Sequence, residues 1–164
     1  MATKTQTRFK TRIDINENSR VQLVELLNQH LADLFDLYSQ TKQAHWNVRG
    51  IHFQQLHELF DELAGQLPEF VDMLAERANT LGGYARGTAR MAANNSQLPE
   101  FPTDVTEGEQ MLEVVAERWA QYAAFVRQGI TSAEQLGDMD TADLFTEISR
   151  AVDKSLWFIE AHLQ

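Results

Sequence analysis

The chain has 164 residues, of which 43% are hydrophobic and 23% are charged, a balance typical of one globular domain rather than a disordered segment. It contains no cysteine, which excludes disulfides and thiolate metal sites, so a bound metal ion would need His, Asp or Glu ligands. The formal net charge of -10 should repel nucleic acid and attract cations. No apolar run is long enough for a signal peptide or a membrane span, so we expect a cytoplasmic protein without membrane contact.

The first twelve residues depart from this acidic composition. They carry Lys4, Arg8, Lys10 and Arg12 and no acidic residue. A short basic arm on an acidic body indicates contact with a polyanion such as DNA, although an ordinary frayed terminus explains the composition equally well. We therefore expect a flexible arm over residues 1–17 and a folded domain over residues 18–164.

Helical periodicity starts after this arm. Asn18 and Ser19 can cap a first helix that runs to about His45, before the stop signal at residues 47–50. A second helix is predicted from Phe53 to Asn79, with Pro68 as a possible kink. The apolar positions of the first helix follow the i, i+3, i+4, i+7 rhythm of one buried face: Val21, Val24, Leu27, Leu31, Leu34, Phe35 and Tyr38.

Residues 80–105 are rich in Gly, Asn and Pro and form a long connection, in which residues 88–93 can make a short helix. A third helix is predicted to begin at Thr106 as its cap and to end near Gly137, and a fourth to run over residues 141–161. No segment has the pattern of a strand. The fold class is therefore all-α: a four-helix bundle with a long crossover between its second and third helices.

Five residues have the side chains of metal ligands. They are His45, at the end of the first predicted helix, and His57, Asp61, Asp72 and Glu76, on the second. His57 with Asp61, and Asp72 with Glu76, are pairs at i and i+4, about 6 Å apart on one helix face. Imidazole combined with carboxylate suits Fe(II), Mn(II) or Zn(II). Each pair alone is more often a solvated surface feature than a metal site.

The two pairs cannot meet within one chain. His57 and Glu76 lie about 28 Å apart along a helix at 1.5 Å per residue. Either there are two weak half-sites, or two copies of this helix run antiparallel across a two-fold axis and share two equivalent sites. The pairings His57 with Glu76 and Asp61 with Asp72 have the same midpoint, between residues 66 and 67. Ala64 and Gly65 lie near it and would permit close helix contact. His30, His52 and His162 have no comparable partners, and we expect them to be structural.

The run Lys42-Gln43-Ala44-His45-Trp46-Asn47-Val48-Arg49-Gly50 resembles the signature of the Dps family, the DNA-binding proteins from starved cells. The resemblance extends over nearly the whole chain from about residue 18. The other matching segments are residues 53–61, 72–77, 81–83, 140–143 and 153–160.

The resemblance implies a ferritin-like fold, a dodecamer around a mineral cavity and an oxidoreductase activity. The implied ferroxidase site takes His45, His57 and Asp61 from one subunit and Asp72 and Glu76 from its two-fold partner. It implies oxidation of Fe(II) at a di-iron site, preferably by hydrogen peroxide, storage of the Fe(III) mineral product in the cavity of the shell, and protection of DNA. Zn(II) or Mn(II) could occupy the same ligands. Trp46 would lie near the site, and we expect it to have a packing role.

Two further features concern iron entry and DNA. An acidic cluster near the end of the third predicted helix is a candidate pore lining, or else a solvated helix junction: Glu134, Asp138, Asp140 and Asp143. The basic arm is short, so DNA binding should be weak. An alternative is a DNA-compacting protein in which metal binding is secondary. A larger ferritin or di-iron bundle oxidase is disfavoured, because the chain has no Glu-x-x-His motif.

Overall fold

The computed structural model describes residues 7–164, and these residues form six helices and no strand. The expected all-α class is therefore confirmed. The helices are α1 (Glu17–Asn47), α2 (Phe53–Gly65), α3 (Leu67–Thr80), α4 (Ala89–Asn95), α5 (Gly108–Gln135) and α6 (Met139–Glu160).

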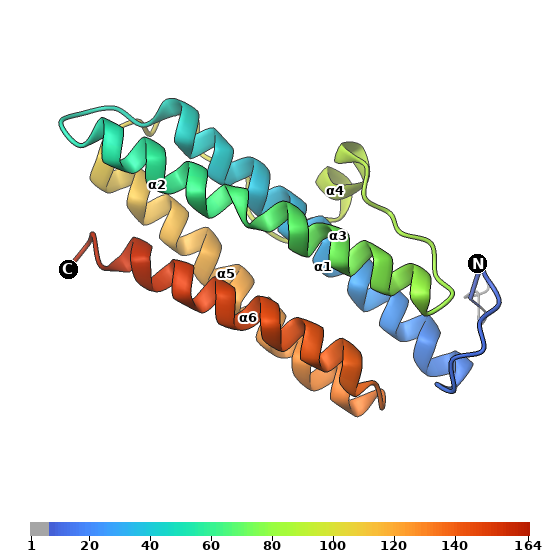
Figure 1. Ribbon diagram of the computed structural model, residues 1–164. Helices are drawn as coiled ribbons and strands as arrows, with labels where there is room; N and C mark the ends of the chain where they lie inside the picture. The colour runs from blue at the N-terminus through green and yellow to red at the C-terminus, as the bar shows by residue number, and fades with distance from the viewer. Residues whose placement is uncertain (1–6) are drawn as a thin grey trace.

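The helices form four long rods, with α2 and α3 together making one of them (Figure 1). One layer holds α1 beside α2–α3, the other holds α5 beside α6, and α4 lies outside the bundle on the crossover. This is the expected four-helix bundle with its crossover between the second and third rods. None of the helices within residues 7–164 combines the length and apolar character needed to cross a bilayer.

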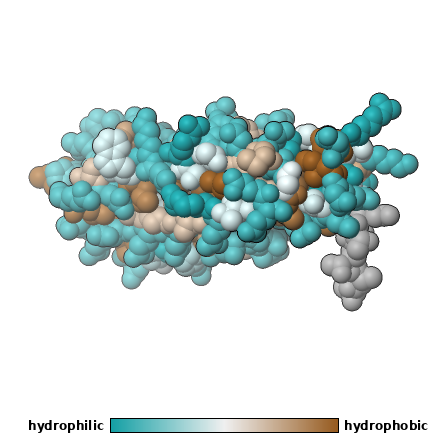
Figure 2. All heavy atoms as spheres, turned by 90° about the horizontal axis from the view of Figure 1, so that it is seen from below, coloured by the Kyte–Doolittle hydropathy of each residue, from teal (hydrophilic) through white to brown (hydrophobic). Residues whose placement is uncertain are grey.

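The core lies between the two layers. Leucines of α1 are buried along the inward face, and the large aromatic side chains Trp119, Tyr122 and Phe145 fill the space opposite them. Trp119 Nε1 donates a hydrogen bond to Thr41 Oγ1 at 3.1 Å, which satisfies the indole N–H inside the core. The outer surface of the α5–α6 side is mostly hydrophilic, with apolar atoms in separate spots (Figure 2).

The second rod is broken rather than kinked. We expected one helix from Phe53 to Asn79 with Pro68 as the bend, but α2 ends at Gly65 and α3 begins at Leu67. Pro68 occupies the first turn of α3, where its missing N–H removes no intrahelical bond. Gln66, between the helices, donates from Nε2 to Ser155 Oγ of α6 at 2.7 Å. The break therefore lies two residues before the proline and is tied to α6.

Two helix caps differ from the expected ones. The cap of α1 is Asn16, whose Oδ1 accepts from the Asn18 backbone N–H at 2.9 Å, so neither Asn18 nor Ser19 caps it. The cap of α5 is Glu107, whose carboxylate accepts from the backbone of Glu109 at 3.0 Å. Thr106 instead accepts from the Arg49 N–H through its carbonyl, at 2.7 Å. In each case a nearby residue with a similar acceptor takes the capping position.

The N-terminal segment is packed from residue 7 onward, so the expected flexible arm through residue 17 is not seen for residues 7–16. The Phe9 N–H donates to Gly82 O at 2.8 Å, and Ile13 and Ile15 pack against the core. Arg20 of α1 reaches Leu81 O at 3.3 Å beneath this segment. These apolar and backbone contacts hold the segment to the bundle. Lys4 of the basic arm lies outside the described residues.

The crossover is fastened to α1 by buried polar side chains. Asn28 Nδ2 donates to Tyr84 O at 3.1 Å, and Asp33 Oδ1 accepts from the Gln97 N–H at 2.7 Å. Two turns further along α1, Gln40 Nε2 donates to Pro99 O at 2.9 Å. These bonds satisfy backbone groups of a connection that has little secondary structure of its own.

Candidate metal centre

His45 and His57 form a stacked pair at the turn between α1 and α2. Their ring centroids lie 3.8 Å apart with planes 20° from parallel. His45 Nδ1 lies 2.7 Å from His57 O, and His57 Nδ1 lies 2.8 Å from His45 O. Each histidine is thus oriented by the backbone carbonyl of the other.

These two bonds determine the tautomer of both rings. A carbonyl oxygen can only accept, so each Nδ1 carries the proton and each Nε2 keeps a free lone pair. Metal-binding histidines typically donate their second ring N–H to a carbonyl or carboxylate in this way. The donor chemistry of the pair therefore fits a divalent transition metal.

The chain folds into this arrangement because the turn between the helices is short and tightly bonded. Gly50 has φ of 114°, a conformation that favours glycine, and its carbonyl accepts from the Phe53 N–H at 3.1 Å. The Phe53 ring stacks on His57 with centroids 5.1 Å apart. His45 O belongs to the last turn of α1, where carbonyls lack intrahelical partners, and the His57 ring supplies one.

Asp61 lies one turn after His57 on α2. Its Oδ1 is 3.9 Å from His45 Nε2 and 2.6 Å from the Nζ of Lys42, with which it forms an ion pair. The Lys42 hydrogen bond is the main cause that holds the pKa of Asp61 below its ordinary value, and the positive charge of Lys42 adds to it. The structure thus stacks His45 on His57 and places Asp61 near His45, with the carboxylate kept in its charged form by Lys42.

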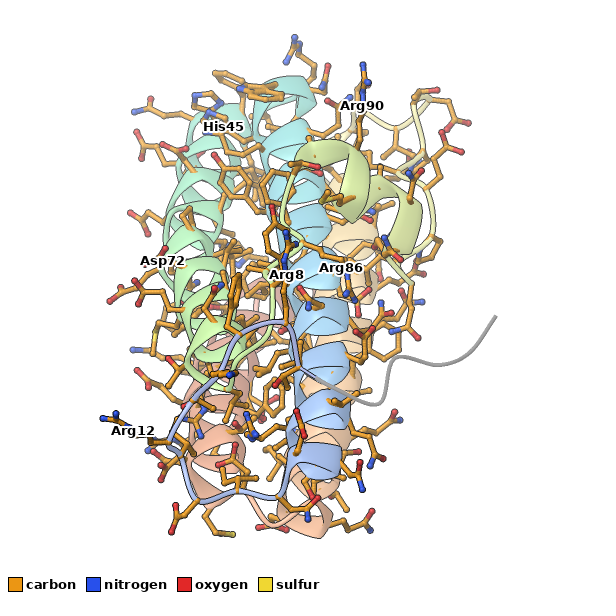
Figure 3. All side chains as sticks on the ribbon, turned by 90° about the vertical axis from the view of Figure 1, so that its right-hand side faces the viewer. Arg8, Arg12, His45, Asp72, Arg86 and Arg90 are labelled. Atoms are coloured by element: carbon orange, nitrogen blue, oxygen red, sulfur yellow. The ribbon has the colours of Figure 1, made fainter. Side chains whose placement is uncertain are left out.

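Asp72 and Glu76 lie apart from these three, on the outward face of α3. Both side chains are exposed. His45 and Asp72 project from the same side of the bundle at different heights (Figure 3). Within residues 7–164 of one chain, no group of three or more His, Cys, Asp or Glu side chains is arranged to hold a metal ion.

The outward face of the second rod is continuous across its break. Asp61, Gly65, Pro68, Asp72 and Glu76 follow one another at spacings of three or four residues, and all five are exposed. A side chain added at Gly65 would meet nothing within 4 Å. Ala64, by contrast, is fully buried inside the chain, so of the two small residues only Gly65 is available at the expected contact.

The acidic cluster near the α5–α6 turn divides into two parts. Glu134, Asp140 and Asp143 are exposed, whereas Asp138 is 2% exposed and turned inward. Asp138 caps α6 by accepting from the Thr141 N–H at 3.1 Å, and it pairs with Arg77 of α3 at 2.9 Å. Burial alone would raise the pKa of Asp138, but the bonds from Thr141 and Arg77 lower it overall. Asp138 therefore joins two helices, which corrects its expected position on a pore lining.

The remaining histidines and Trp46 have varied surroundings. His30 is buried between Tyr122 and Phe145, and burial lowers its pKa to about 4. His52 and His162 are exposed. Trp46 is 58% exposed, so the packing role expected for it is not seen within one chain. Its ring centroid lies 5.8 Å from Lys42 Nζ.

Sequence reasoning did not single out Lys42 as a residue of this centre. The available signal was its position one turn before His45, which places both side chains on the same face of α1. Its ion pair with Asp61 depends on how α1 and α2 face each other, and neither helix alone reveals that.

The basic residues near the N-terminus lie on the surface of the bundle. The Arg8 guanidinium carbon lies 4.1 Å from the Tyr84 ring centroid, and Lys10 and Arg12 are exposed. Arg86 lies close to Arg8 in Figure 3, and both of its terminal nitrogens donate to the Glu25 carboxylate, at 2.7 and 3.1 Å.

The four-helix bundle and its long crossover are those of a ferritin-like protein, and the ferritin-like domain family matches residues 24–164. The chain is 41% identical over 155 residues to the DNA protection during starvation protein of Agrobacterium fabrum (strain C58), covering 94% of this chain and 96% of that one. The chain belongs to the Dps family of ferritin-like proteins.

Solved structures agree with this assignment. DpsC from Streptomyces coelicolor superimposes with a TM-score of 0.90 at 32% identity, covering 100% of this chain and 96% of that one. An archaeal Dps homologue from Halobacterium salinarum gives a TM-score of 0.89 at 28% identity, covering 99% and 91% of the two chains.

Proposed function

We propose that this chain is a ferroxidase subunit that oxidises Fe(II), stores the Fe(III) product inside a homo-oligomeric shell and so protects DNA. The observation that carries the proposal is the reciprocal bonding of His45 and His57, which leaves both Nε2 lone pairs free beside the charged Asp61. The relative from Agrobacterium fabrum is named for DNA protection during starvation, which agrees with this role.

The site is completed, in this proposal, by Asp72 and Glu76 of the partner subunit. Two observations support an antiparallel pairing of the second rods. Asp61, Asp72 and Glu76 share one exposed face, and the break at Gln66 coincides with the midpoint of the expected pairing. The same register places Gly65 opposite Pro68 of the partner subunit, where the absent side chain leaves room for the proline ring.

The residues would act on iron as their substrate. Neutral imidazoles and carboxylates together bind Fe(II), and the added negative charge of the carboxylates favours the ferric product. Two Fe(II) ions held together can supply two electrons to one hydrogen peroxide, which avoids one-electron release of hydroxyl radical. Peroxide is therefore the oxidant that we propose, with two Fe(II) consumed per peroxide.

The shell is proposed to be a dodecamer built from two-fold dimers, in the cytoplasm. Fe(II) would enter through a pore lined by the exposed acidic residues Glu134, Asp140 and Asp143, because a cluster of carboxylates raises the local concentration of cations. Asp138 is not part of this lining, because it is buried against Arg77.

The decisive experiment mixes two damaged subunits. Each protein is loaded with Fe(II) without oxygen, and hydrogen peroxide is then added. We expect His57→Ala and Glu76→Ala each to slow Fe(II) oxidation by at least about tenfold, a typical loss when a metal ligand or a residue that orients one is removed. Shells co-assembled from both variants should recover activity, since a mixed dimer keeps one intact site and one doubly damaged site. Near-ultraviolet absorbance gives the rate of Fe(II) oxidation, and peroxide consumption gives the number of Fe(II) ions oxidised per peroxide.

His162→Ala is the matched control, because His162 follows α6, is exposed, and its ring lies against Phe158 O rather than a predicted ligand. Mass spectrometry verifies that the subunits have mixed. If the mixed shells oxidise Fe(II) no faster than shells of either variant alone, the proposal that two chains share each site is contradicted. Wild-type oxidation no faster than iron in buffer would contradict the ferroxidase function itself.

A second candidate function is DNA compaction with metal binding secondary. The observation in its favour is that Arg8, Lys10 and Arg12 are exposed on the body of the molecule, with Arg8 stacked on Tyr84. Three described basic residues per chain on an acidic protein favour weak, salt-sensitive binding. This function becomes the leading one if the iron experiment fails.

A further inference from the structure

Lys42 forms an ion pair with Asp61, one of the predicted ligands of the candidate centre. Its Nζ lies 2.6 Å from Asp61 Oδ1, the same oxygen that is 3.9 Å from His45 Nε2. The Lys42 side chain is 20% exposed and comes from the same face of α1 as His45. The ammonium group of Lys42 is thus a cation that pairs directly with Asp61.

A second position for this ammonium group is within reach. Lys42 Nζ is already 5.8 Å from the centroid of the Trp46 ring, inside the range of a cation–π contact. Trp46 follows Lys42 by four residues, so the two side chains are neighbours on the helix surface. Because Trp46 is 58% exposed, its ring is open to a closer approach.

We propose that Lys42 is a placeholder cation, which holds Asp61 until a divalent metal ion displaces it toward Trp46. This inference rests on the proposed metal site and adds Lys42 as the residue that sets the affinity of that site for a divalent metal ion. Metal binding must break the Lys42–Asp61 ion pair and tolerate a nearby positive charge, so Lys42 weakens binding. A singly charged ion gains too little from Asp61 to displace a lysine that is attached beside it, whereas a divalent ion gains more.

The test measures binding of Zn(II), which undergoes no oxidation, to the assembled protein by calorimetry. Lys42→Met keeps the length and apolar stem of the side chain but removes its charge. We expect Zn(II) to bind Lys42→Met about fivefold or more tightly than wild type, the factor that corresponds to a strong, partly exposed ion pair. Lys42→Arg, which keeps the charge, should not show this gain.

Lys154→Met is the matched control, because Lys154 also lies near an aromatic ring, with its Nζ 5.7 Å from the Phe158 centroid, but makes no contact with Asp61. It removes the same charge from α6 and should leave the Zn(II) affinity within about twofold of wild type. A second readout is tryptophan fluorescence. Zn(II) should change it in wild type through Trp46, and the change should be lost in Trp46→Phe and reduced in Lys42→Met.

The outcomes separate this inference from the proposed function. If wild type and His57→Ala bind Zn(II) equally, the metal site itself is wrong and both proposals fail. If wild type binds in a His57-dependent way but Lys42→Met binds no more tightly, the placeholder role alone is overturned. Equal gains in Lys42→Met and Lys154→Met would also overturn it, because they would reflect net charge alone.

Discussion

His45 and His57 illustrate what single residues reveal before a structure is known. Their residue types and the i, i+4 spacing of His57 and Asp61 were enough to predict ligands. The reciprocal bonds between the two rings and the two carbonyls depend on the turn at residues 48–52, which positions α1 against α2. The tautomers, and the Lys42–Asp61 ion pair, could not be predicted from spacing along either helix.

His30 leads to a prediction on the pH dependence of stability. Burial lowers its pKa to about 4, whereas an unfolded histidine titrates near 6.5. As the pH falls through this interval, the unfolded chain takes up the proton first and the free energy of unfolding decreases. The loss between pH 7 and pH 5 should be about 2 kcal/mol per chain. His30→Leu should lack this part of the pH dependence in denaturant unfolding.

The two rings that pack against His30 carry no charge that would stabilise its protonated form. It faces Tyr122 on α5 and Phe145 on α6, and the buried Asp33 lies one turn further along α1. His162→Leu serves as the control, because it removes a histidine that is exposed, rather than buried, in the folded chain. If His30→Leu and wild type lose the same free energy on acidification, His30 is protonated in the folded protein and this account is wrong.

At the scale of helices, hydrophobic periodicity predicted the four rods well, because each buries one continuous apolar face. The ends were less predictable. Asn16, Asn18 and Ser19 all have side chains that can cap, and only the packing of residues 7–16 decides that Asn16 does so. Pro68 correctly indicated an interruption, but the break lies at Gln66, since a proline is tolerated in the first turn of a helix.

Asp138 allows the junction of α3 and α6 to be tested. Asp138→Ala removes the cap of α6 and leaves Arg77 without its partner, so we expect a loss of about 2–4 kcal/mol in the free energy of unfolding. The pKa of Asp138 is lowered in the folded chain, so this stabilisation is present above the ordinary carboxyl pKa. It should disappear as the pH falls through the lowered value.

Asp140→Ala is the control for this prediction, because Asp140 lies in the same first turn of α6 but is exposed. It should cost no more than about 0.5 kcal/mol in urea unfolding. Equal effects of the two substitutions would mean that a general charge effect at the helix start, rather than the buried pair, stabilises this junction.

At the scale of the whole molecule, the spacing of residues in the sequence predicts a two-fold pairing and no larger assembly. The fixed rise of a helix makes the distance between the two half-sites calculable, and the shared midpoint gives the register. The number of subunits depends on surfaces that the periodicity does not describe, so the dodecamer stays a prediction from family resemblance. The arm was also misjudged in part, since residues 7–16 pack on the body.

Gly65 provides a test of the pairing. A side chain added there meets nothing within the chain, so Gly65→Leu should leave each subunit folded, with unchanged helix content by circular dichroism. In the proposed dimer the leucine would meet Pro68 of the partner subunit and prevent close approach. We expect the shell to dissociate to smaller species in size-exclusion chromatography with light scattering.

The control is Ala124→Leu, an exposed position on α5 that accepts the same added side chain away from the proposed axis. It should assemble like wild type. Normal assembly of Gly65→Leu would place the two-fold contact elsewhere.

The hydrogen bond from Gln66 to Ser155 links α6 to the proposed metal site, although α6 contributes no predicted ligand to that site. In the proposed site, the predicted ligands of the second rod lie on α2 and α3, on either side of the break, so the angle at Gln66 would set the distance between them. Under two-fold symmetry, any change in that angle is repeated in the partner and alters both shared sites at once. In the proposed dimer, the spacing of the predicted ligands would therefore depend on how α6 packs, and sequence variation far from any of them would change it.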